Sequence, residues 1–229
     1  MSHDTFSLDD FRGESRLFPL PNLVVFPHVV QPLHIFEPRY VEMLEDAVAG
    51  DNLIAMGLLL PGWEGQYEGR PSVDPFVCLG RVLTHTPTKD NRYNILLGGI
   101  TRAKIVEELP PNRSFREVRL DLLADIDADP NDNLTSELHK ELVAAFRTFV
   151  PDTDQVQKQL GEILNSHAQL GTLTDLISYS LPLDLALRQT LLAEVDVIQR
   201  TRLLLDQLSR VEANSEGLRR PFPPDFSEN

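Results

Sequence analysis

The stretch from Phe18 to Tyr40, FPLPNLVVFPHVVQPLHIFEPRY, constrains the fold more than any other part of the sequence. Its five prolines fix the backbone angle φ at their positions, and each removes a hydrogen-bond donor that a central strand would need. Apolar residues fill most of the positions between the prolines. The stretch therefore predicts short strands joined by rigid bends.

The first half of the chain consists of short runs rich in leucine and β-branched residues, separated by Pro and Gly at the density of turns. The last run alternates clearly, with Val118, Leu120 and Leu122 on one face and charged residues on the other. Residues 89–91 predict a hairpin turn, and the glycine pair at 98–99 predicts a bulge or a sharp bend. A small closed or strongly coiled sheet would accommodate these features. The expected strands are 23–26, 33–36, 53–60, 76–86, 93–97, 101–107 and 115–123.

Helical periodicity appears once inside this β-rich region and then dominates the second half of the chain. Pro38 suits the first turn of a helix that Gly50 ends. Beyond residue 125 the apolar residues recur at helical spacing, and the third helix there is expected to start with a capping box of Thr172 and Asp175. The expected helices of this half lie around residues 134–146, 156–164, 173–177, 187–191 and 196–211.

These patterns predict an α+β protein in four parts. Residues 1–15, with few large apolar side chains, are expected to form a flexible N-terminal arm. Residues 16–125 form the β-rich module with one helix, and residues 126–212 form the helical module. Residues 213–229 contain three prolines without periodicity and predict an extended tail.

Charge and composition limit the partners and the location of the chain. The net charge of -14, from 35 acidic and 21 basic residues, repels phosphate backbones and makes nucleic acid an unfavoured partner. No apolar run reaches the roughly 20 residues that cross a bilayer, and the first residues lack the pattern of a signal peptide. Cys78 is the only cysteine, so no internal disulfide forms. We expect a cytoplasmic protein without a membrane partner.

Metal chemistry finds little support in the sequence. The D-x-D-x-D pattern that begins at Asp125 resembles a calcium loop, but Pro130 stands where that loop needs Gly and Ser136 where it needs a bidentate Glu. Residues 121–154 hold nine acidic and two basic residues, which a solvated acidic joint explains without a metal. The histidines of the strand-like segments lack ligand spacing. We expect no metal and no cofactor.

The residues around the start of the first helix form a compact motif. Glu37 and Arg39 flank Pro38, between the aromatic residues Phe36 and Tyr40. A carboxylate at this position favours a packing role, against the amino end of the helix or a buried guanidinium group. No second carboxylate or nucleophile stands beside Glu37, so we interpret the five residues as a structural motif and expect no catalytic residue.

The loop between residues 61 and 75 is the candidate binding segment. It carries Trp63, the only tryptophan, and Tyr67 among glycines that allow a side chain to sit exposed. Exposed aromatic side chains favour contact with peptides. Two interpretations stay open: Trp63 and Tyr67 bind a polypeptide, or Trp63 folds back as a lid on the sheet.

Several phrases of the sequence resemble the amino-terminal, substrate-binding domain of Lon-type proteases. The resemblance begins with PLPNLVVFP, LHIFEPRY and EDAVAGD, continues through LGRV and the segment 93–102, and returns in LTDLI at residues 173–177. It ends with Arg188-Gln189 and Asp196-Val197, in the order typical of the family. The resemblance covers about residues 16–210.

The resemblance implies a PUA-like β-barrel followed by a helical bundle that engages unfolded or tagged proteins. The sequence has no G-x-x-x-x-G-K-[ST] phosphate loop and no catalytic Ser-Lys segment, so we expect a stand-alone form without ATPase or protease activity. The expected function is recognition of polypeptides, as an adaptor for a Lon-type or other protease or in quality control. RNA binding through the PUA-like barrel is the alternative, and a small-molecule enzyme lacks any acid-base or nucleophile constellation.

Overall fold

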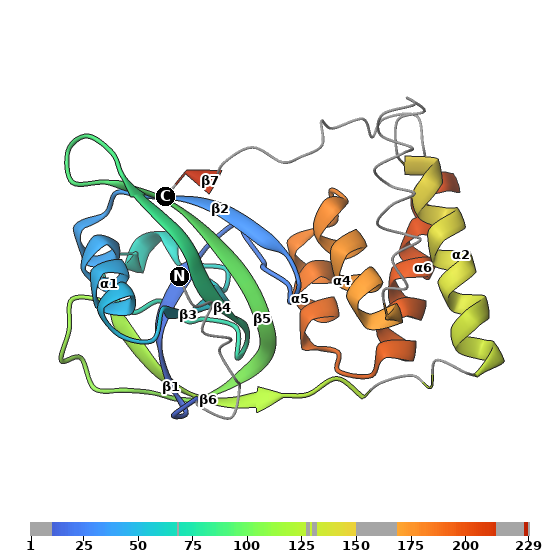
Figure 1. The fold of residues 1–229 in the computed structure, drawn as a ribbon, viewed down its shortest axis with the longest axis horizontal. Helices are drawn as coiled ribbons and strands as arrows, with labels where there is room; N and C mark the ends of the chain where they lie inside the picture. The colour runs from blue at the N-terminus through green and yellow to red at the C-terminus, as the bar shows by residue number, and fades with distance from the viewer. Residues whose placement is uncertain are drawn as a thin grey trace, which may run out of the picture.

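The computed structural model describes residues 11–67, 69–126, 129, 132–149, 169–213 and 227–228. Figure 1 shows a curled sheet with helix α1 beside it and helices α2, α4, α5 and α6 gathered on the opposite side. The fold is a mixed α+β structure, which confirms the predicted class.

The sheet closes on itself through one extra strand pairing. Its order is β4-β3-β1-β6-β5-β2-β7, and β4 also pairs with β5, so the first five strands in this order form a ring. Within the ring, β1 and β3 are parallel and the other pairs are antiparallel. This arrangement confirms the expected small closed sheet. The strands are β1 (Glu14–Leu20), β2 (Val30–Ile35), β3 (Leu53–Leu58), β4 (Phe76–Pro87), β5 (Tyr93–Glu108), β6 (Arg116–Leu123) and the short β7 (Ser227–Glu228).

Two apolar clusters follow from the alternation of side chains along these strands. Leu17 and Phe18 are neighbours in β1 and both fully buried, yet they belong to different clusters because they face opposite sides of the sheet. The smaller cluster takes residues from all five ring strands and fills the ring. The larger one joins the outer face of the sheet to α1 and to the distant helices, so one continuous core supports both halves.

The helices lie close to their predicted positions. Helix α1 begins at Pro38, and Gly50 ends it by donating its backbone N–H to the carbonyl of Ala47 at 3.1 Å. No helix among the described residues is long and apolar enough to cross a bilayer. The predicted helix at 156–164 lies outside the described residues. The helices are α1 (Pro38–Ala49), the short 3-10 helix η2 (Glu64–Gln66), α2 (Asn133–Phe149), α4 (Leu170–Ser180), α5 (Leu185–Ala193) and α6 (Val197–Ala213).

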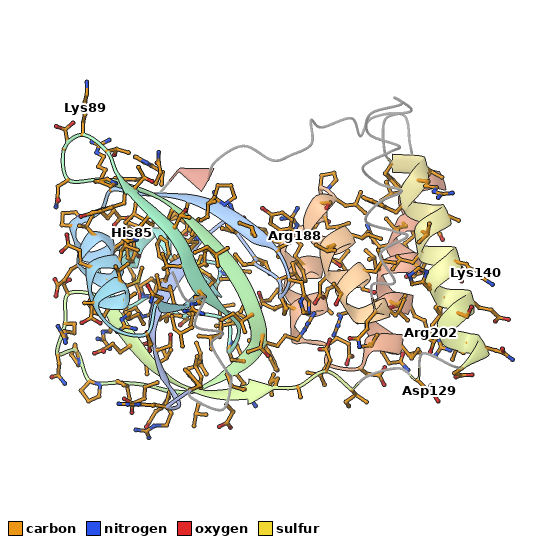
Figure 2. All side chains as sticks on the ribbon, in the orientation of Figure 1. His85, Lys89, Asp129, Lys140, Arg188 and Arg202 are labelled. Atoms are coloured by element: carbon orange, nitrogen blue, oxygen red, sulfur yellow. The ribbon has the colours of Figure 1, made fainter. Side chains whose placement is uncertain are left out.

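The predicted turn and bulge are both confirmed. The loop after β4 brings the N–H of Thr88 within 2.7 Å of the carbonyl of Arg92, and Asp90 and Asn91 adopt φ values of 61° and 55°. Short polar side chains tolerate this left-handed conformation best. Lys89 projects from the tip of the hairpin (Figure 2). On β5, Ile100 has no partner in the β4 register, which marks the bulge beside Gly99.

Some predicted elements were wrong. The expected strand at 23–26 does not form: Val24, Val25 and Phe26 are buried without strand pairing. The sequence did not predict β1, which begins at Glu14 and so takes in two residues of the expected arm; Pro19 concealed its strand character. The runs 93–97 and 101–107 form the single strand β5.

The predicted capping box at Thr172 and Asp175 is also wrong. Helix α4 begins two residues earlier, at Leu170, with Gln169 at its N-cap position and no side-chain cap. Asp175 lies inside the helix and is fully buried. Its carboxylate has a different partner, described below.

Candidate functional site

The carboxylate of Glu37 joins the start of α1 to the 61–75 loop. Glu37 is the N-cap residue in an extended conformation, and its carbonyl accepts hydrogen bonds from the N–H groups of Tyr40 and Val41, both at 2.9 Å. Its side chain does not cap the helix. The carboxylate accepts a hydrogen bond from Arg39 Nε at 3.1 Å and a short one from the hydroxyl of Tyr67.

The guanidinium group of Arg39 lies between two aromatic rings. Its Cζ atom is 4.7 Å from the centre of the Tyr40 ring and 4.6 Å from that of the Tyr67 ring, distances typical of cation–π contacts. Arg39 Nη1 also donates to the backbone carbonyl of Tyr67 at 3.1 Å. The structure thus brings Tyr67 together with Glu37 and Arg39, which precede it by 30 and 28 positions in the sequence.

Phe36 lies apart from this cluster. It is one of the exposed large apolar residues, and its ring stacks near His34, with a centroid distance of 6.0 Å, and under Arg92. Of the five residues predicted as a structural motif, Phe36 therefore faces another part of the surface.

The position of Trp63 combines features of both interpretations of its loop. Its side chain is half-buried and contacts Tyr67 edge-on, with ring centroids 5.5 Å apart. Helix η2 connects the two residues, and both of its ends adopt helical backbone angles. The pair is ordered by this contact and still presents aromatic surface to solvent.

Beside Tyr67 the surface opens into a pocket of about 350 Å³, which we call the arginine pocket. Its walls come from the start of α1, the middle of the 61–75 loop and the segment between β5 and β6, with Pro19 and Leu59 completing them. Its lining residues include four arginines and three aromatic residues: Arg39, Arg70, Arg113, Arg116, Tyr40, Tyr67 and Phe115. No Asp or Glu is found among the described residues of this lining.

Carboxylates that are not part of the lining form ion pairs with the arginines and hold them in place. Glu108 bridges Arg70 and Arg116, at 2.8 and 2.6 Å, and Arg116 also donates to the carbonyl of Pro71 at 2.8 Å. Arg113 has a longer ion pair with Asp46, at 3.4 Å. The side chain of Arg116 is therefore held firmly by its partners, and that of Arg113 is held more loosely.

The aromatic hydroxyl groups of the pocket stay protonated. Burial raises the pKa of Tyr40, and burial together with the Glu37 hydrogen bond raises the pKa of Tyr67. Both phenols are therefore neutral at physiological pH. Ser114, the one hydroxyl nucleophile candidate in the described lining, donates to Glu42 at 2.5 Å, and no histidine lines the pocket among the described residues. This arrangement suits binding through stacking and hydrogen bonds.

A second polar cluster, which the sequence did not reveal, lies between the sheet and the helices. Arg102 on β5 forms a bidentate ion pair with Asp175 on α4, and Arg200 on α6 forms one with Asp125. Arg102, Asp175 and Arg200 are almost fully buried. Asp125, expected to be part of a solvated acidic joint, is instead the partner of buried guanidinium groups.

This cluster fixes the sheet to the helices. Burial alone would lower the pKa of Arg102, but the hydrogen bonds and charge of Asp175 outweigh it, so that pKa is raised and Arg102 stays charged. Arg102 Nε donates to the carbonyl of Leu192 at 3.0 Å. An acidic residue on the apolar face of α4 is the one sequence signal that could have indicated Asp175. In the described part of the chain, no three His, Cys, Asp or Glu side chains are placed to hold a metal ion.

Residues 14–210 match the family described as the ATP-dependent protease La (LON) substrate-binding domain. The chain belongs to this family. Similar Lon proteases occur in Trichlorobacter lovleyi, with 28% identity over 200 residues, and in Brevibacillus choshinensis, with 27% over 201. The Lon protease of Escherichia coli is 25% identical over 197 residues. These matches cover 85–86% of this chain and 23–25% of the relatives, so the chain spans about a quarter of their length.

Solved structures of Lon amino-terminal domains share the fold. The domain from the Mycobacterium avium complex superimposes with a TM-score of 0.68 at 18% identity, covering 86% of this chain and 98% of that one. The domain from Xanthomonas campestris gives 0.63 at 21% identity, covering 84% and 97%. The Lon resemblance seen in the sequence is thereby confirmed.

Proposed function

We propose that this protein binds segments of other polypeptides at the arginine pocket and carries out no reaction on them. The observation that carries the proposal is the stacked arrangement of Tyr67, Arg39 and Tyr40 beside an open pocket. Rigid aromatic rings and guanidinium groups provide large contact area at low cost in conformational entropy, and such residues dominate protein interfaces. Membership of a substrate-binding family supports the same conclusion.

The size of the pocket suits one or two side chains of an extended segment. At about 350 Å³ it lies at the lower end of the range, roughly 300–1,000 Å³, of sites that enclose a ligand. We propose that Trp63 and Tyr67 are the aromatic anchors at its rim. In this proposal the chain acts in the cytoplasm as an adaptor in proteolysis or quality control, with a PUA-like barrel and a helical bundle as its two modules.

RNA binding remains the weaker candidate. The chain as a whole carries a net charge of -14, which repels a phosphate backbone. Binding of a nucleic-acid backbone needs several guanidinium or ammonium groups for successive phosphates. We therefore expect weak binding of RNA, without sequence preference, at 0.15 M salt.

The test compares affinity and stability in the same variants. Titration calorimetry with a reduced, carboxymethylated client protein should show binding to the purified chain. The double variant Trp63→Ala, Tyr67→Ala should bind about 1 to 3 kcal/mol more weakly if the two rings are anchors. Phe36→Ala removes an exposed aromatic side chain outside the pocket and serves as the matched control. Casein should remain intact and ATP unhydrolysed in the presence of the purified protein.

Each result has one meaning. Unchanged client affinity in the double variant would remove the loop as the binding site. A fall of several degrees in the melting temperature of the single variant Trp63→Ala, with client affinity retained, would show that Trp63 is a packed lid. If no unfolded client binds the wild-type chain, the proposed function is wrong.

A further inference from the structure

Among the described residues, the four arginines of the arginine pocket pair with the carboxylates of Glu37, Glu108 and Asp46, and Ser114 of the lining donates to a fourth carboxylate, that of Glu42. Asp46 is shared by Arg16 and Arg113, and Glu108 is shared by Arg70 and Arg116, so neither carboxylate is reserved for one arginine of the pocket. We infer that the arginine pocket selects a client segment by an acidic side chain. The inference rests on the proposed function and adds the chemistry that the site selects.

Arg113 has the greatest capacity to bind an incoming carboxylate. Its side chain is 49% exposed, and its ion pair with Asp46 at 3.4 Å is too long for a strong charge-assisted hydrogen bond. Within the described residues its other contact is a loose one with the Phe115 ring, at 6.0 Å. A guanidinium group has five N–H donors, so those of Arg113 are available to a ligand.

Arg70 faces the same pocket from the loop. Its side chain is 34% exposed, and it uses Nη1 for both the carbonyl of Leu109, at 3.1 Å, and Glu108, at 2.8 Å. Its Nε and Nη2 groups make no hydrogen bond to the described residues. Glu108 is shared with Arg116, so this carboxylate does not neutralise both guanidinium groups. An arriving carboxylate would complete the neutralisation.

Arg39 and Arg116 have a supporting role. Arg116 is nearly buried and holds Glu108 with two hydrogen bonds. Arg39 is fixed between the two tyrosine rings, but its buried Nη2 atom lacks a hydrogen bond among the described residues, although it lies 2.9 Å from a Glu37 oxygen.

The aromatic rings predict the residue next to the acidic one. Tyr67 and Phe115 line the pocket, and Trp63 contacts Tyr67 from outside. An acidic residue followed or preceded by an aromatic or large apolar residue would engage the guanidinium groups and the rings together. The acidic remainder of the chain repels such a segment, so its negative charge favours this pocket over other positions on the protein.

Two capped peptides test the inference, acetyl-Gly-Ser-Phe-Glu-Leu-Gly-Ser-amide and the same peptide with Gln in place of Glu. Calorimetric titration of the full chain should show about tenfold tighter binding of the acidic peptide at 0.05 M salt, as expected for charge-assisted hydrogen bonds to partly exposed groups. The preference should shrink at 0.5 M salt because the guanidinium groups are partly exposed.

Variants identify the groups responsible. The double variant Arg70→Gln, Arg113→Gln should bind the two peptides equally. Arg119→Gln is the matched control, because Arg119 has the same 49% exposure and pairs with Glu14 and Glu107 outside the pocket. This control should keep the preference for the acidic peptide.

The outcomes separate this inference from the proposed function. Equal binding of both peptides to the wild-type chain would overturn the inference and leave polypeptide recognition intact. If neither peptide nor the unfolded client binds the wild-type chain, both the inference and the proposed function are wrong. A Gln peptide with a free C-terminal carboxylate is a third probe: if it binds as tightly as the acidic peptide, the pocket selects chain ends, and the inference is wrong.

Discussion

Arg102 on β5 and Asp175 on α4 are 73 positions apart in the sequence and form a two-pronged ion pair in a region closed to solvent. The pair joins the ring of strands to the helices. Arg200 and Asp125 extend it, so that four charged side chains from four segments share one site, in which Asp125 alone of the four is partly exposed. Such a site stabilises the fold only when every charge has its partner.

Asp175→Asn should therefore be strongly destabilising. The amide keeps the shape of the side chain but leaves Arg102 buried without its full counter-charge, for an expected loss of about 3 to 5 kcal/mol in the free energy of unfolding. Urea denaturation measures this loss. Asp206→Asn breaks an exposed ion pair with Arg210 and should cost less than about 1 kcal/mol. Similar losses in the two variants would contradict the role given to the buried pair.

Gly99→Ala should disrupt the sheet at its bulge. A Cβ atom on Gly99 would lie 2.0 Å from the backbone carbonyl oxygen of Phe26, and backbone cannot move aside as a side chain can. The N–H and carbonyl of Gly99 also bond to Val29 and His28, which hold the segment in place. We expect a loss of about 3 kcal/mol or more. Gly65→Ala is the control, because its Cβ would meet no atom within 4 Å; equal effects would disprove the steric argument.

The thiol of Cys78 should make stability fall in alkaline solution. Burial raises its pKa from 9.0 to about 12, more than the charge of Arg102 lowers it. Between these two pH values the unfolded chain loses the thiol proton and the native protein keeps it. This contribution is complete below pH 9 and is lost as the pH rises toward 12, by up to about 1.4 kcal/mol per pH unit.

Measurement of unfolding free energies at pH 8, 9 and 10 should thus give a steeper decline for the wild type than for Cys78→Ala. The variant has lower stability at pH 8 because of the missing atom, so the slopes are the quantities to compare. In addition, iodoacetamide should leave native Cys78 unmodified at pH 8 and alkylate it in urea. Parallel slopes, or rapid alkylation of the native protein, would contradict burial of the thiol.

Tyr67→Phe should separate the hydroxyl from the ring. The ring remains over Arg39, but the hydrogen bond to Glu37 is lost, with an expected cost of about 0.5 to 1.5 kcal/mol in unfolding free energy. Tyr93→Phe is a fitting comparison, since its hydroxyl makes a longer, exposed contact of 3.3 Å with Glu45 and should cost less. A larger loss for Tyr93→Phe than for Tyr67→Phe would show that the Glu37 contact contributes little.

Local chemistry made part of the fold predictable. Pro38 marks the start of α1 because the first turn does not need the N–H group that proline lacks. Gly50 marks the end because a residue without a side chain tolerates the backbone conformation at which the helix stops. The Asp90-Asn91 turn and the alternation in β6 are likewise properties of a few neighbouring residues. For such elements the information lies within one turn or one strand.

Features that depend on distant partners could not be predicted. The buried run at 23–26 has the composition of a strand, yet no neighbouring strand is available to it. Asp175 fits the pattern of a helix cap until its partner Arg102 is known. The pocket joins Arg39, Tyr67 and Arg113 from three separate segments, and only the folded chain places their side chains together.

The edge contact between Trp63 and Tyr67 makes the fluorescence of Trp63 a reporter of events at the arginine pocket. Because Trp63 is the only tryptophan, all of its indole emission comes from one place, a single side-chain contact away from the arginine pocket. The half-buried indole senses the water around it, so a ligand that shifts the Tyr67 ring or excludes that water changes the colour and intensity of the emitted light. Occupancy of the pocket can thus be followed in unlabelled protein, on any timescale that a fluorimeter resolves.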